Sequence, residues 1–144
     1  MEQLQLGDQV IRFDRERTTL AYSSMKGGDA ERCGCSYCRN FAAQRSTAYP
    51  EVFRALLDKL GIDPEKEGEV YESGPEASLR VYGGWLYFAG ELVRSGERMT
   101  DTGSRFRYWF ADATNLPKPA ADFGPRVLAV EFLTRLPWVI ADQP

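Results

Sequence analysis

Histidine is absent from all 144 residues of the chain. Its absence removes the most common general base, the Ser-His and Cys-His nucleophile pairs, and the mixed Cys/His zinc patterns. The chain therefore lacks a residue that most familiar hydrolytic mechanisms require. We accordingly expect a domain that is not an enzyme.

Long apolar runs and excess positive charge are also missing. No stretch approaches a membrane span, and residues 1–8 have neither the basic start nor the apolar run of an export signal, so we expect no membrane association. The chain has 18 basic and 21 acidic residues, giving a net charge of −3. This balance lacks the positive field of proteins that bind phosphate backbones, which argues against nucleic acid as a partner.

Cysteine is scarce but clustered, because the only three in the chain are Cys33, Cys35 and Cys38. An odd number cannot pair fully within one chain and is typical of a reducing compartment. We therefore expect a cytoplasmic protein. A chain of this length can form one hydrophobic core without disulfide bonds, so residues 1–144 are predicted to form a single domain.

The first half of the chain carries two helical patterns. One covers Ser36–Ala48, and the other begins at Pro50, whose missing N–H is tolerated at a helix start, and ends before Gly61, which suits a left-handed cap. Before them, residues 10–13 and 18–22 are predicted to form a strand, a turn and a second strand. Residues 23–32 are predicted to be a loop.

The second half carries strand patterns. They cover residues 70–72, 78–93, 105–111 and 127–133, with Phe106, Tyr108 and Phe110 facing the core. The pair Gly83-Gly84 predicts a bulge or a close approach of two backbones. Helices followed by strands, without alternation, predict an α+β domain with two helices packed on one face of an antiparallel β-sheet.

The cysteine cluster has the spacing of a candidate metal site. Cys33 and Cys35 can lie in a loop while Cys38 projects from the first turn of the following helix. Zinc usually takes four tetrahedral ligands, with sulfur at roughly 2.3 Å, and the positive helix start favours thiolates. The fourth ligand must then come from a carboxylate such as Asp29 or Glu31, from water, or from another chain.

Two other interpretations of the cysteines remain open. Cys35 and Cys38 form a Cys-x-x-Cys pair at a predicted helix start, as in a thiol–disulfide oxidoreductase or a redox sensor. The expected antiparallel strands lack the βαβ context of thioredoxin, however, and Cys33 has no role in that chemistry. Alternatively, Cys35 and Cys38 are reduced structural residues that face the core.

The composition and the cysteine cluster together predict a small interaction or regulatory domain, in which the cysteine segment is structural or holds zinc. A partner protein would bind the open sheet face or the aromatic terminus around Trp138. The alternative is an enzyme or redox sensor that uses Cys35 and Cys38.

Several segments resemble a family of small uncharacterised bacterial proteins. The resemblance spans roughly residues 23–140 and implies a bacterial, cytoplasmic single domain. It implies no activity and no site residues. The segments that carry it are Cys38-Arg39-Asn40-Phe41, Tyr49-Pro50-Glu51-Val52-Phe53, Leu60-Gly61-Ile62-Asp63-Pro64, Tyr82-Gly83-Gly84-Trp85, Glu131-Phe132 and Leu136-Pro137-Trp138-Val139.

Overall fold

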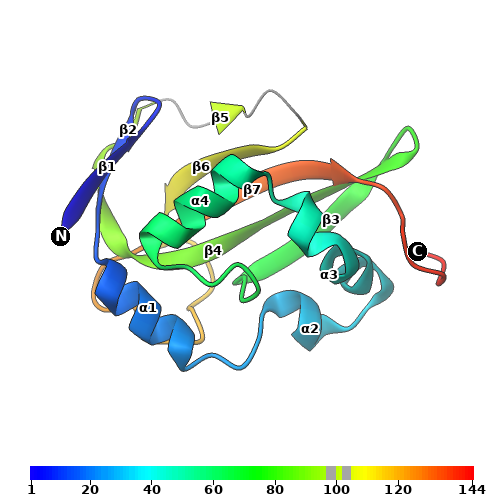
Figure 1. Cartoon of the computed structure of the whole chain (residues 1–144), viewed down its shortest axis with the longest axis horizontal. Coiled ribbons are helices and arrows are strands. Elements are labelled where there is room, and N and C mark those ends of the chain that lie inside the picture. Colours follow the sequence, from blue (N-terminus) through cyan, green and yellow to red (C-terminus); the bar gives the residue numbers. More distant parts are fainter. Residues whose placement is uncertain (97–99, 102–104) are drawn as a thin grey trace.

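The computed structural model describes residues 1–96, 100–101 and 105–144. Four helices and seven strands are formed by these residues (Figure 1). In chain order they are β1 (Glu2–Leu6), β2 (Gln9–Phe13), α1 (Arg15–Ser23), α2 (Asp29–Cys33), α3 (Ser36–Ala48), α4 (Glu51–Leu60), β3 (Glu69–Glu76), β4 (Leu79–Arg94), β5 (Thr100–Asp101), β6 (Arg107–Asp112) and β7 (Val127–Leu136).

The strands form one sheet in the order β1-β2-β4-β7-β6-β5, and every strand pair among the described residues is antiparallel. The long strand β4 is the centre of the sheet. Along one edge it pairs first with β3 and then with β2, and along the other edge it pairs with β7. The predicted α+β class with an antiparallel sheet is confirmed.

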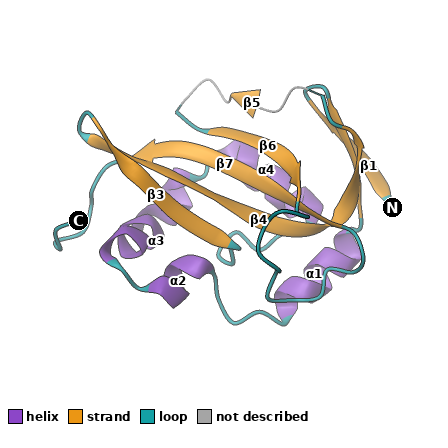
Figure 2. Cartoon of the chain, turned by 180° about the vertical axis from the view of Figure 1, so that it is seen from behind, coloured by secondary structure: helices purple, strands orange, loops and turns teal. Residues whose placement is uncertain are grey.

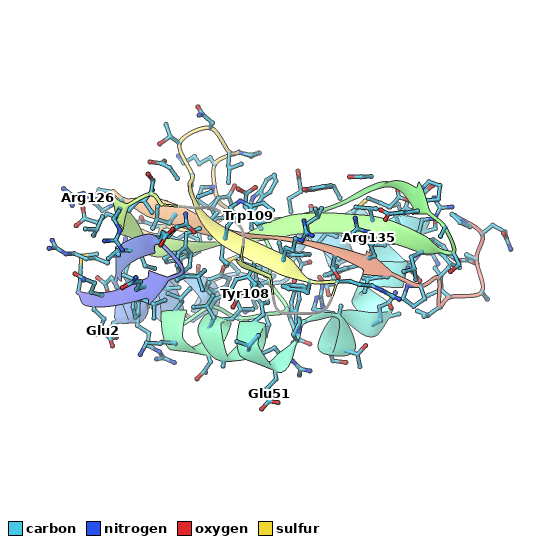
Figure 3. All side chains as sticks on the ribbon, turned by 90° about the horizontal axis from the view of Figure 1, so that it is seen from above. Glu2, Glu51, Tyr108, Trp109, Arg126 and Arg135 are labelled. Carbon is cyan, nitrogen blue, oxygen red and sulfur yellow. The ribbon has the colours of Figure 1, made fainter. Side chains whose placement is uncertain are left out.

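The helices lie on one face of the sheet, as Figures 1 and 2 show from opposite sides. Viewed from above, Tyr108 lies on the helix side of β6 and Trp109 on the opposite side (Figure 3). Phe53 of α4 packs against Phe106 and Tyr108, with ring centroids 4.7 and 5.1 Å apart. Phe106, Tyr108 and Phe110 are all buried, as predicted. No helix in the described ranges is both long and apolar enough to cross a membrane.

The predicted helices over Ser36–Ala48 and before Gly61 are confirmed as α3 and α4, and α1 and α2 join them. The strand predicted over residues 18–22 is wrong, because these residues belong to α1. The Asp14 carboxylate caps α1 by accepting the Arg17 N–H at 3.0 Å. The Thr18 hydroxyl then accepts the N–H of Ala89 in β4 at 2.9 Å, which fixes the helix against the sheet. The loop predicted over residues 23–32 contains most of α2.

The pair Gly83-Gly84 marks a close backbone approach inside a continuous β4, which was one of the two predicted alternatives. A Cβ atom on Gly84 would overlap the backbone oxygen of Glu69 in β3. A Cβ atom on Gly83 would overlap the ring of Tyr71, which lies across this position. Both glycines therefore allow β3 and its side chains to pack directly on β4.

A side chain joins β2 to β6, although β4 and β7 separate these strands in the sheet. The Gln9 amide donates to the backbone oxygen of Phe110 and accepts the Phe110 N–H, each at 2.9 Å. Gln9 is buried. The sheet therefore curls far enough for one amide side chain to bridge β2 and the edge of β6.

Candidate metal centre

The structure brings all three cysteines to one point at the junction of α2 and α3. The sulfur atoms of Cys33, Cys35 and Cys38 lie within 4.8 Å of one another. Three sulfurs on a tetrahedral zinc ion would be about 3.8 Å apart, as follows from a zinc–sulfur distance near 2.3 Å. The thiols are free, so no disulfide prevents the three sulfurs from binding one ion.

Local structure explains why residues that are neighbours in the chain face one another. Helix α2 ends at Cys33, and Gly34 follows with a left-handed φ of 67°, which reverses the chain. Cys35 is then the N-cap of α3, and its sulfur accepts the N–H of Cys38 at 3.4 Å. Cys38 occupies the first helical turn, as predicted. The chain reversal at Gly34, between the end of α2 and the start of α3, thus brings the thiols of Cys33, Cys35 and Cys38 together.

The two thiols of the Cys-x-x-Cys pair differ in pKa because their surroundings differ. At Cys35, partial desolvation raises the pKa of the thiol. Hydrogen bonds from the N–H groups of Cys38 and Tyr37 and from the neighbouring thiols have a larger, opposite effect. The pKa of Cys35 is therefore lowered overall. Burial raises the pKa of Cys38 well above its ordinary value, and its proximity to Cys33 and Cys35 raises it further. Cys35 is therefore the more acidic thiol.

A buried ion pair holds α2, and with it Cys33, against the rest of the domain. The Glu67 carboxylate accepts the N–H of Ala30 at 2.9 Å and an Arg45 N–H at 3.0 Å. Arg45 also donates to Glu31 at 2.8 Å, so one arginine of α3 bridges acids on both sides. The Asp29 carboxylate accepts the Val70 N–H of β3 at 2.9 Å. The position of Cys33 is therefore fixed by contacts from α3, β3 and the segment before β3.

Neither carboxylate proposed from the sequence as a fourth ligand joins the cysteines. Asp29 is bound to β3 and Glu31 to Arg45, and both lie outside the group of close sulfur atoms. Among the described residues, no histidine, aspartate or glutamate completes this group. Of the three sources predicted for a fourth ligand, a carboxylate from Asp29 or Glu31 is therefore not supported, and water or another chain remains. The chain offers three thiols and an accessible side, because Cys33 and Cys35 are exposed.

The C-terminal segment packs on the helix that carries Cys38. The Asn40 amide donates to the Pro137 oxygen at 3.1 Å and accepts the Val139 N–H at 2.7 Å. The rings of Tyr37 and Trp138 meet edge to face, with centroids 5.8 Å apart. The C-terminal segment therefore docks on α3 beside the cysteine cluster, and Figure 1 shows the C-terminus next to this helix.

The sequence pattern located the cysteines but not the residues that position them. Glu31, Arg45 and Glu67 are separated by 14 and 22 positions, and no periodicity links them. No protein-family model, no curated protein and no solved structure matches the chain.

Proposed function

We propose that this chain is a small cytoplasmic, non-enzymatic interaction or regulatory domain that holds one zinc ion between Cys33, Cys35 and Cys38. The observation that carries the proposal is the convergence of three free sulfur atoms within 4.8 Å. Thiolates are preferred ligands of zinc, and a zinc ion held by three protein ligands can complete its tetrahedron with a water molecule. Solvent would occupy the open position.

The surroundings support a site that is held in place rather than an accidental cluster. Arg45 and Glu67 are buried and join the two helices that supply the cysteines. Metal sites typically depend on such supporting hydrogen bonds to orient their ligands. These contacts therefore hold the ligand-bearing backbone in place.

A partner protein would approach beside the cysteines, at the C-terminal segment. Trp138 packs on Tyr37, and its indole N–H donates to the Asp142 oxygen at 2.6 Å. Arg39, which directly follows Cys38, forms an ion pair with Asp142. Because these contacts link the segment to α3, an ion bound at Cys38 would influence the surface offered to the partner.

The test is the metal content of the purified chain, measured by native mass spectrometry and elemental analysis. We expect one zinc ion per chain, its loss in Cys38→Ser, and its retention in the control Ser36→Ala, which alters a neighbouring residue without removing a thiol. Chelation should lower the melting temperature of the wild type but not that of Cys38→Ser. Unchanged melting of the wild type after chelation would count against the proposal.

The asymmetry of Cys35 and Cys38 supports a second candidate, a thiol–disulfide oxidoreductase. The Cys35 thiolate would attack a substrate disulfide, and Cys38 would then lose its proton and displace the second substrate thiolate, leaving a Cys35–Cys38 disulfide for an external dithiol to reduce. Insulin reduction in the presence of dithiothreitol distinguishes the candidates. Redox chemistry predicts loss of activity in Cys35→Ser and full activity in Cys33→Ser.

A further inference from the structure

We propose that the three-cysteine site binds the neutral trihydroxides of thiophilic trivalent metalloids, of which arsenous acid is the simplest, in preference to zinc. The inference rests on the proposed metal site and specifies which chemical species the three thiols prefer. Trivalent arsenic forms three bonds to sulfur in a pyramid whose apex carries a lone pair. It therefore needs no fourth ligand, whereas zinc does.

The number of donors is the first argument. Cys33, Cys35 and Cys38 converge, and no other carboxylate, histidine or cysteine of the described residues joins them. Asp29 and Glu31, the nearest acids along the chain, are already bound to Val70 and Arg45. Three sulfur ligands leave one of the four coordination positions of zinc to solvent, whereas they fill all three bonding positions of trivalent arsenic.

Charge is the second argument. Three thiolates around a divalent ion leave one net negative charge, whereas three thiolates around a trivalent centre leave none. Cys38 is buried, and an uncompensated charge beside buried groups is costly. A neutral product therefore suits this half-buried position better than an anionic zinc complex.

Access is the third argument. Cys33 and Cys35 are exposed, and apart from these two neighbours a Cβ atom on Gly34 would meet no atom within 4 Å. A small trihydroxide can therefore reach the sulfurs from solvent.

The binding step is a condensation that needs no oxidant or reductant. Each thiol sulfur forms one bond to arsenic, one arsenic–oxygen bond breaks, and the thiol proton leaves with the hydroxide as water. Three thiols and one arsenous acid molecule thus give one adduct and three waters. The oxidation state of arsenic and of every sulfur is unchanged.

Native mass spectrometry tests the inference directly, using the zinc-loaded chain and equimolar arsenite. We expect release of the zinc, detected with a chromogenic chelator, and an adduct whose mass shows the loss of three waters. In Cys33→Ser the adduct should lose only two waters and retain one hydroxide. Circular dichroism of the variant checks that it is folded.

Phenylarsine oxide is the matched control, because its arsenic can bond to only two thiols. Cys33→Ser should weaken arsenite binding but leave phenylarsine oxide on Cys35 and Cys38. A wild-type arsenite adduct that retains a hydroxide, or zinc that equimolar arsenite does not displace, would overturn the inference and leave the zinc proposal standing. A chain that binds neither zinc nor arsenite would overturn both.

Discussion

Replacing Glu67 probes the buried ion pair that positions the cysteine segment. Glu67 is completely buried, and its carboxylate serves both the Ala30 N–H and Arg45. Removing one partner of a buried ion pair costs about 3–5 kcal/mol. Because Arg45 keeps its second partner, Glu31, we expect Glu67→Ala to lower the free energy of unfolding by about 3 kcal/mol.

The pH dependence of stability separates the charge of Glu67 from its hydrogen bonds. Burial raises the pKa of the Glu67 carboxyl above its ordinary value of 4.5, although the Ala30 N–H and Arg45 act in the opposite direction. A carboxyl whose pKa is raised in the folded state contributes stability that is fully present below the unfolded-state pKa and is lost as the pH rises through the folded-state pKa. Ionisation of Glu67 therefore opposes folding.

Glu67→Gln is the matched variant, because the amide retains an acceptor oxygen of similar size but cannot ionise. Urea unfolding of both proteins, followed by tryptophan fluorescence from pH 4 to pH 8, gives their difference in stability at each pH. We expect the wild type to be relatively most stable at the acidic end and to lose that advantage as the pH rises. A difference that is constant, or that grows in favour of the wild type with rising pH, would refute the dominant role of burial.

Three further perturbations test the fold and its link to the site. Gly84→Ala should lower the free energy of unfolding by about 1–3 kcal/mol in urea titrations, and more than Gly83→Ala, because its methyl group meets a backbone oxygen rather than a partly exposed ring. Gln9→Ala should cost about 2–4 kcal/mol, since it leaves a buried N–H and C=O of β6 without partners, whereas exposed Gln5→Ala should change little. If the proposed zinc ion is bound, chelating it should speed hydrogen exchange at the Val139 N–H, and identical exchange with and without chelator would contradict the proposed coupling between the site and the terminus.

Sequence patterns were sufficient to predict the elements that are stabilised by residues close together in the chain. The apolar stripe of α4 and the left-handed Gly61 after it predicted that helix and its end, and φ of Gly61 is indeed 84°. Residues 18–22 of α1 have the pattern of a strand because threonine and tyrosine favour strands. Its start signal was Asp14, whose carboxylate caps the helix.

The candidate site was predictable only in part, for a similar reason. The spacing of Cys33, Cys35 and Cys38 within six residues made their convergence foreseeable. The bridge from Arg45 to Glu31 and Glu67 was not, because it depends on how α2, α3 and the chain before β3 meet in three dimensions. The hydrogen bond between the Asp29 carboxylate and the Val70 N–H of β3 likewise could not be predicted without the fold.

The amide of Gln9 has a consequence for how the molecule behaves among its own copies. Exposed strand edges present free N–H and C=O groups that can recruit a strand from a second molecule and so seed aggregates. At Phe110 both groups are already occupied by Gln9 from the same chain. A strand from a second molecule therefore finds no free backbone N–H or C=O group at this position of β6.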